Sequence, residues 1–129
     1  MENEKQKSFE VTAEIKVKLT QEDIDDIMSG ALDFIGYWCR KAEVVGKYLG
    51  EYASEQISRG GTLKLYDMEA GLVYSLTLEK FLKGFRLWIE NGDDRYHAVE
   101  DGVVDTCNID GIMADMIVQY AIFDEVIYG

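Results

Sequence analysis

The sequence contains no proline in 129 residues. Average usage would give roughly six, so Pro-rich linkers and segments that bind SH3-type domains are excluded. The two cysteines, Cys39 and Cys107, allow one disulfide at most. Residues 1–7 are polar, and the apolar run of residues 116–123 is too short for a membrane span. We therefore expect a cytoplasmic protein, working in a host cell, with reduced thiols and no signal peptide.

Histidine is almost absent, and this restricts catalysis and metal binding. The single histidine, His97, could act as a base toward the thiol of Cys39, but no pattern places the two side chains together. One histidine and two cysteines make a poor zinc site. Residues 101–111 resemble a calcium loop, yet counting ligands from Asp105 puts Met116 where a bidentate glutamate is needed. No glycine-rich nucleotide motif is present, so we expect no catalytic residue, no cofactor and no metal.

Positive charge is scarce. The chain contains 13 Lys and Arg and 25 Asp and Glu, which gives a net charge of −12. Such a surface repels phosphate groups, so the chain is not expected to bind nucleic acid or anionic membranes directly. Residues 20–39 carry five acids and residues 96–129 carry seven, and neither segment contains Lys or Arg.

This charge pattern has two interpretations. Acidic surfaces can simply keep a protein soluble. They can also complement a basic partner, for example the nucleic-acid groove of another bacterial protein, in which case the chain mimics DNA. On the second interpretation the candidate binding residues are Glu22, Asp25, Asp26, Asp33, Asp101 and Asp105.

The hydropathy pattern predicts an α+β fold, a small antiparallel sheet with about four helices packed mainly on one face. Residues 1–8 read as a flexible tail and residues 9–129 as a single globular domain. Apolar and polar residues alternate strictly over residues 9–19, which predicts a strand with one wet face. Residues 62–66 and 72–76 read as two strands joined by the loop of residues 67–71.

The helical segments are marked by capping residues and by spacing. A helix begins after Thr20, with Asp23 three residues on. Residues 37–45 fit either a continuation of it or a separate extended piece. A second helix is predicted over residues 44–58, before Gly60. A third follows Thr77, and residues 111–123 form a last one.

The last predicted helix is apolar nearly all round, because only Gly111, Asp115 and Gln119 interrupt it. Such a helix lies in the core or at an interface. We expect burial within one chain, with a monomer favoured and a homodimer as the alternative. The predicted core residues are Ile15, Val17, Ile27, Leu63, Leu65, Phe81, Phe85, Trp88, Ile117 and Tyr120.

Three stretches resemble a family of small uncharacterised proteins carried on prophages and mobile elements of gut Firmicutes. They are residues 37–63, with Tyr37-Trp38-Cys39 and Gly60-Gly61-Thr62-Leu63, residues 76–84, and residues 114–121. The resemblance covers about residues 20–129 and brings no catalytic or binding residues. It implies an inhibitor of host defence, a class that includes anti-CRISPR proteins, with a CRISPR effector or another basic nucleic-acid-binding protein as its partner.

We therefore expect a non-enzymatic acidic binding protein that inhibits a basic bacterial protein. Two alternatives remain at this point. One is a structural or accessory homo-oligomer of a mobile element. The other is a small enzyme that uses Cys39 or His97.

Overall fold

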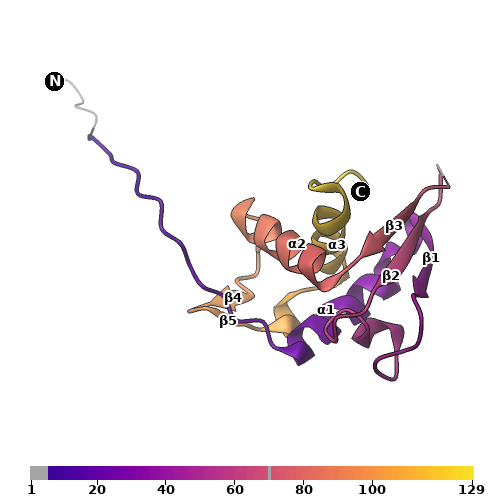
Figure 1. Ribbon diagram of the computed structural model, residues 1–129. Coiled ribbons are helices and arrows are strands. Elements are labelled where there is room, and N and C mark those ends of the chain that lie inside the picture. The colour runs from indigo at the N-terminus through magenta and orange to yellow at the C-terminus, as the bar shows by residue number, and fades with distance from the viewer. Residues whose placement is uncertain (1–5, 70) are drawn as a thin grey trace.

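The computed structural model describes residues 6–69 and 71–129, and its α+β class agrees with the prediction (Figure 1). The three α-helices are α1 (Gln21–Phe34), α2 (Leu78–Glu90) and α3 (Gly111–Phe123). The strands are β1 (Cys39–Val44), β2 (Leu63–Asp67), β3 (Val73–Leu76), β4 (Val99–Glu100) and β5 (Val103–Val104). Short 3-10 helices are η1 (Ile35–Tyr37), η2 (Ala53–Glu55) and η3 (Thr106–Asn108). In this described part the α-helices number three, and not about four.

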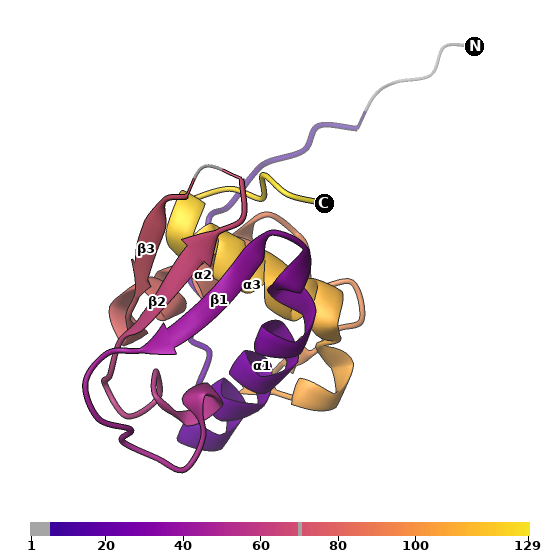
Figure 2. The same ribbon diagram turned by 90° about the vertical axis from the view of Figure 1, so that its right-hand side faces the viewer.

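The main sheet is antiparallel, with the order β1-β2-β3, and helices cover one of its faces (Figure 2). In the central strand β2, Leu63 and Leu65 are buried while Lys64 between them is exposed. This alternation is typical of a sheet with one dry face. β4 and β5 form a separate two-stranded hairpin.

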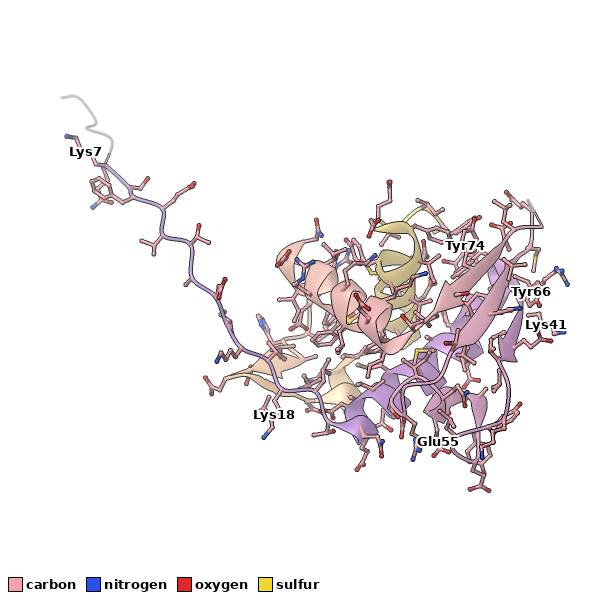
Figure 3. The ribbon with its side chains drawn as sticks, viewed as in Figure 1. Lys7, Lys18, Lys41, Glu55, Tyr66 and Tyr74 are labelled. Carbon is pink, nitrogen blue, oxygen red and sulfur yellow. The ribbon has the colours of Figure 1, made fainter. Side chains whose placement is uncertain are left out.

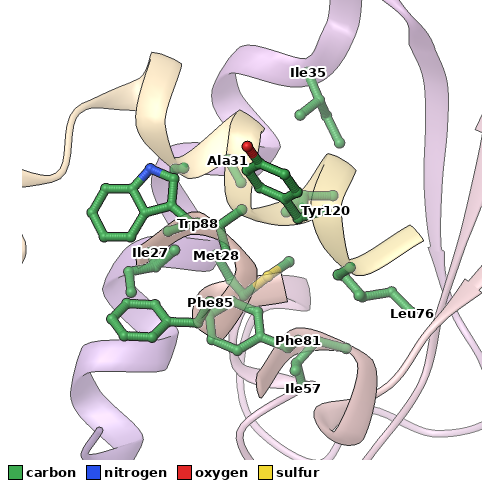
Figure 4. Packing of buried hydrophobic residues seen from close by; sticks show 14 of the residues in the cluster. Ile27, Met28, Ala31, Ile35, Ile57, Leu76, Phe81, Phe85, Trp88 and Tyr120 are labelled. Carbon is green, nitrogen blue, oxygen red and sulfur yellow. The ribbon is translucent and has the colours of Figure 1, made fainter. Parts of the chain in front are cut away.

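Helix α3 lies at the centre of the core and contacts both α1 and α2. Val118 and Ile117 are fully buried, as is most of the helix, and Ile112 at its start is 57% exposed. The prediction that the helix is buried within one chain is therefore confirmed for most of its length. Figure 4 shows Tyr120 of α3 among the buried side chains of α1 and α2.

The helix predicted over residues 44–58 is wrong. Residues 39–44 form β1, which also answers the open question about residues 37–45, and only η2 is helical in the stretch that follows. Gly46 adopts a positive φ of 75°, which ends regular structure. The buried Gln56 side chain then holds the loop, because it accepts from the backbone N–H of Leu49 at 3.0 Å and donates to the carbonyl of Lys47. Hydrogen bonds from a side chain thus hold this segment in place of the backbone hydrogen bonds of a helix.

The strand predicted over residues 9–19 is also wrong. In the described part of the chain these residues are extended but pair with no strand, apart from one parallel bridge between Lys18 and Val103 of β5. Phe9 and Val11 are each 85% exposed, and the predicted core residue Ile15 is 76% exposed. Val17 is partly buried, and the other predicted core residues are buried. Of the predicted tail, residues 1–5 lie outside the described residues and residues 6–8 are exposed.

Candidate functional site

The two acidic segments without Lys or Arg meet in space. Asp26 of α1 accepts a hydrogen bond from the hydroxyl of Thr106 in η3 at 3.0 Å. Further along α1, a Cβ added to Gly111 would lie 3.3 Å from the Cβ of Phe34. Residues 105–111 therefore run beside α1 from its middle to its end, as Figure 2 shows for the segment that precedes α3.

Five exposed carboxylates lie along the contact between α1 and residues 105–111, and we call them the acidic face. Helical spacing places three of them on one side of α1. The other two come from the adjoining segment and cap helices: Asp105 accepts from the N–H of Cys107 at 3.1 Å, and Asp110 accepts from that of Met113 at 2.9 Å. These caps hold both carboxylates in place. The acidic face consists of Glu22, Asp26, Asp33, Asp105 and Asp110.

Two of the predicted binding residues lie apart from this face. Asp25 accepts from the hydroxyl of Ser58 at 2.5 Å and forms an ion pair with Arg59 at 3.3 Å, so its charge is compensated. Asp101 lies in the tight turn between β4 and β5, next to Gly102, whose carbonyl accepts from the N–H of Lys18 at 2.8 Å. That turn therefore lies beside a basic part of the chain.

Asp110 was missed by the sequence reasoning. The available signal was its place directly before the apolar helix at Gly111, which is a common position for a capping aspartate. Nothing in the sequence alone showed that this cap would lie next to α1.

The side chains proposed for an enzyme are not arranged for catalysis. Cys39 is buried, its thiol donates to the carbonyl of Lys41 at 3.2 Å, and burial raises its pKa. A thiol that is kept protonated is a poor nucleophile. His97 is exposed between α2 and β4, and no hydrogen bond joins it to Cys39 in the described part of the chain. The geometry gives no support to the enzyme alternative.

The segment with a resemblance to a calcium loop does not form one. Residues 101–111 contain the β4–β5 turn, β5 and η3, and Asp105 and Asp110 serve as helix caps. Among the described residues, no group of three or more His, Cys, Asp and Glu side chains is placed to hold a metal ion.

A second polar site, called here the buried polar cluster, lies where α3 meets η1. It joins the half-exposed Tyr37 to the buried side chains of Trp38, Asp115 and Gln119. Asp115 accepts from the hydroxyl of Tyr37 at 2.5 Å, from Nε1 of Trp38 at 2.8 Å, and from Nε2 of Gln119 at 3.1 Å. Burial and the bond to Asp115 raise the pKa of Tyr37 to about 12. The sequence showed Asp115 and Gln119 as a polar stripe but not their partners.

A hollow of about 500 Å³ opens beside this cluster, lined among others by Tyr37, Ile112, Asp115, Met116 and Tyr128. Both oxygens of Asp115 already accept hydrogen bonds from cluster side chains. The walls of the hollow are therefore mostly apolar, and the carboxylate of Asp115 that borders it is already hydrogen-bonded within the cluster. The buried polar cluster joins parts of the fold, and we assign it no ligand.

Comparison of the chain with protein-family models, with curated proteins and with solved structures found no match in any of the three. Within residues 6–69 and 71–129, no helix has the length and apolar character that crossing a membrane requires.

Proposed function

We propose that this chain is a non-enzymatic binding protein whose acidic face occupies the basic, nucleic-acid-binding surface of another bacterial protein and inhibits it. The observation that carries the proposal is the hydrogen bond between Asp26 and Thr106. It unites two acidic segments that lie 80 positions apart in the sequence into one surface.

The acidic face has the properties that a competitor for phosphate sites needs. Along α1, Glu22 and Asp26 are separated by about 6 Å of helix rise and Asp26 and Asp33 by about 10 Å. All three lie on a helix, and the two remaining carboxylates are caps, so little backbone freedom is lost on binding. Complementary charge then speeds the encounter with a basic surface.

A CRISPR effector is one partner with this chemistry, and the resemblance to prophage proteins is the reason to test it first. That narrower assignment, an anti-CRISPR protein that mimics DNA, rests on the resemblance alone. The acidic face by itself supports the wider class of basic nucleic-acid-binding proteins.

The test compares two double variants that change the net charge equally. Glu22→Lys with Asp33→Lys reverses two exposed carboxylates of the acidic face, and Glu79→Lys with Glu125→Lys reverses two exposed carboxylates elsewhere. Each immobilised protein is incubated with a bacterial lysate at about 0.1 M salt, and captured proteins are identified after elution with added duplex DNA or with about 1 M salt.

The wild type and the control variant are expected to retain the same nucleic-acid-binding proteins, and the acidic-face variant to lose them. A purified captured protein should then associate more slowly with the acidic-face variant, while its dissociation changes less, because rim charges act mainly on the association rate. Capture that both double variants retain equally, or that survives both high salt and DNA, would contradict the proposal.

A further inference from the structure

Residues 9–17 form an extended arm, called here the N-terminal arm, whose first residues point away from the rest of the chain (Figures 1 and 3), while Val17 at its end packs against the core. Its apolar residues occupy every second position, and Phe9, Val11 and Ile15 are 76–85% exposed. Within residues 6–69 and 71–129 the arm belongs to no strand. It thus combines an alternating strand pattern with unpaired backbone groups, which makes it a template for pairing with another chain.

We propose that the arms of two copies of this chain pair as antiparallel strands around a two-fold axis at Ala13. In a symmetric antiparallel pair, residues at equal distances on either side of the axis stand opposite each other and on the same face. This register pairs Phe9 with Val17, Glu10 with Lys16, Val11 with Ile15, Thr12 with Glu14, and Ala13 with itself.

Charge selects this register among its neighbours. With the axis at Ala13, Glu10 of each copy faces Lys16 of the other, and opposite charges directly across a strand pair are stabilising. An axis at Thr12 would place Glu10 opposite Glu14, and an axis at Glu14 would place Glu14 opposite itself. Like charges directly opposite are destabilising.

Two further registers fail for other reasons. An axis between two residues would set each apolar side chain opposite a polar one. The apolar side chains of the two arms would then lie on opposite faces of the ribbon and could not be buried together. An axis at Ile15 also pairs Glu14 with Lys16, but it requires Lys18 as a paired residue, and the N–H of Lys18 is already bonded to Gly102.

The body of the chain leaves room for the second arm. A hollow of about 1100 Å³ lies between residues 12–17 and α2, and its wall on α2 includes Leu82, Phe85 and Ile89. Leu82 is 44% exposed although it lies on the helix that carries much of the core. A two-stranded ribbon is marginal in water unless it packs against a helix. The partner's arm is therefore assigned to this hollow, where the paired apolar faces would cover Leu82.

The first test measures self-association of the full chain by sedimentation equilibrium over a range of concentrations. The wild type is expected to form dimers. Glu10→Lys alone and Lys16→Glu alone should each weaken dimerisation by roughly tenfold, since each reverses two symmetric pairs. The double variant restores opposite charges and should recover the wild-type affinity. The arm is exposed, so these variants keep the core intact, which near-UV circular dichroism verifies.

The second test locates the axis. Ala13→Cys, combined with Cys107→Ser to remove the exposed native thiol, should form a disulfide-linked dimer under mild oxidation, because residue 13 meets itself across the pair. Thr12→Cys in the same background should cross-link less, since position 12 faces position 14.

A monomer at every concentration would overturn the proposal, as would charge variants that dimerise as well as the wild type. If the chain is a monomer, hydrogen exchange at the amides of the arm then shows whether the arm itself fills the hollow beside α2 or the hollow stays empty. Protected arm amides in a monomer would mean that the arm folds into its own hollow, and unprotected amides would mean that it stays free.

Discussion

Asp115 of α3 lies at the edge of the Trp38 ring, where the indole Nε1 donates a hydrogen bond to its carboxylate at 2.8 Å. Tyr128 stacks on the face of the same ring, with the ring planes 3° apart and the centroids 5.3 Å apart. Tyr128 also donates from its hydroxyl to Asp67 of β2 at 2.6 Å. Trp38 thus joins the last helix, the C-terminal segment and the sheet.

Replacing Asp115 by asparagine should destabilise the fold by about 1–3 kcal/mol. The amide keeps one acceptor oxygen, while three neighbouring donors, from Tyr37, Trp38 and Gln119, point at this side chain. Urea unfolding followed by tryptophan fluorescence measures the loss. Asp33→Asn, an exposed change on α1, is the matched control and should stay within about 0.5 kcal/mol. Equal effects of the two substitutions would show that the buried polar cluster adds nothing to stability.

Stability should fall as the pH rises from about 10 to about 12. Burial and a hydrogen bond to Asp93 raise the pKa of Tyr120 from 10.0 to about 12. The folded state therefore favours the protonated phenol, so the contribution of this group is complete below pH 10 and is lost through pH 12. Tyr37, whose pKa is raised to about 12 chiefly by burial, acts in the same direction.

Urea unfolding at a series of pH values measures this loss, and Tyr120→Phe should make the decline less steep because it removes one titrating group. A wild-type free energy of unfolding that stays constant over this alkaline range would contradict the assignment.

Gly84→Ala should destabilise the protein by about 1–3 kcal/mol through overpacking. A Cβ at position 84 would lie 2.5 Å from the backbone oxygen of Ile117 and 2.8 Å from the Cβ of Ala121, so α2 and α3 would have to move apart. Gly36→Ala is the control, because a Cβ at position 36 meets nothing within 4 Å. Thermal unfolding compares the two. A Gly84→Ala protein as stable as the wild type would mean that the α2–α3 contact is looser than described.

Phe85→Ala should cost about 3–5 kcal/mol, because it leaves a cavity where a buried ring contacts Trp88. Leu82→Ala on the same helix should cost less than about 1 kcal/mol, since this side chain is 44% exposed. Chemical denaturation at a low protein concentration separates this effect from self-association. Similar losses at the two positions would show that α2 is turned differently about its axis.

Short-range signals predicted the three α-helices well, although they also predicted a helix over residues 44–58 that does not form. The reciprocal bonds between Thr20 and Asp23, both 3.0 Å, begin α1 at the expected place. Thr77 caps α2 with a single bond, because its hydroxyl accepts from the N–H of Lys80 at 3.3 Å. The apolar run of residues 111–123 became α3 with unchanged limits. These features depend on neighbours within four positions, which a single sequence displays.

The acidic face depended on contacts that the sequence does not display. Both acidic segments were visible as runs without Lys or Arg, but only folding placed Thr106 against Asp26 and Arg59 against Asp25. One contact adds Asp105 to the acidic face, and the other removes Asp25 from it. Both partners are more than 30 positions away in the sequence. Helical and strand periodicity relates residues only a few positions apart, so it does not predict such contacts.

The sequence by itself determined the acidic charge, the capped helices, the β2–β3 hairpin and the apolar character of α3. The tertiary structure decided which extended segments became strands. Residues 39–44 pair with β2, whereas the N-terminal arm has the better alternation and pairs with no strand among residues 6–69 and 71–129. A helix completes its backbone hydrogen bonds from its own residues, but a strand needs a partner elsewhere. Whether an extended segment becomes a strand therefore depends on whether the tertiary fold places another extended segment beside it.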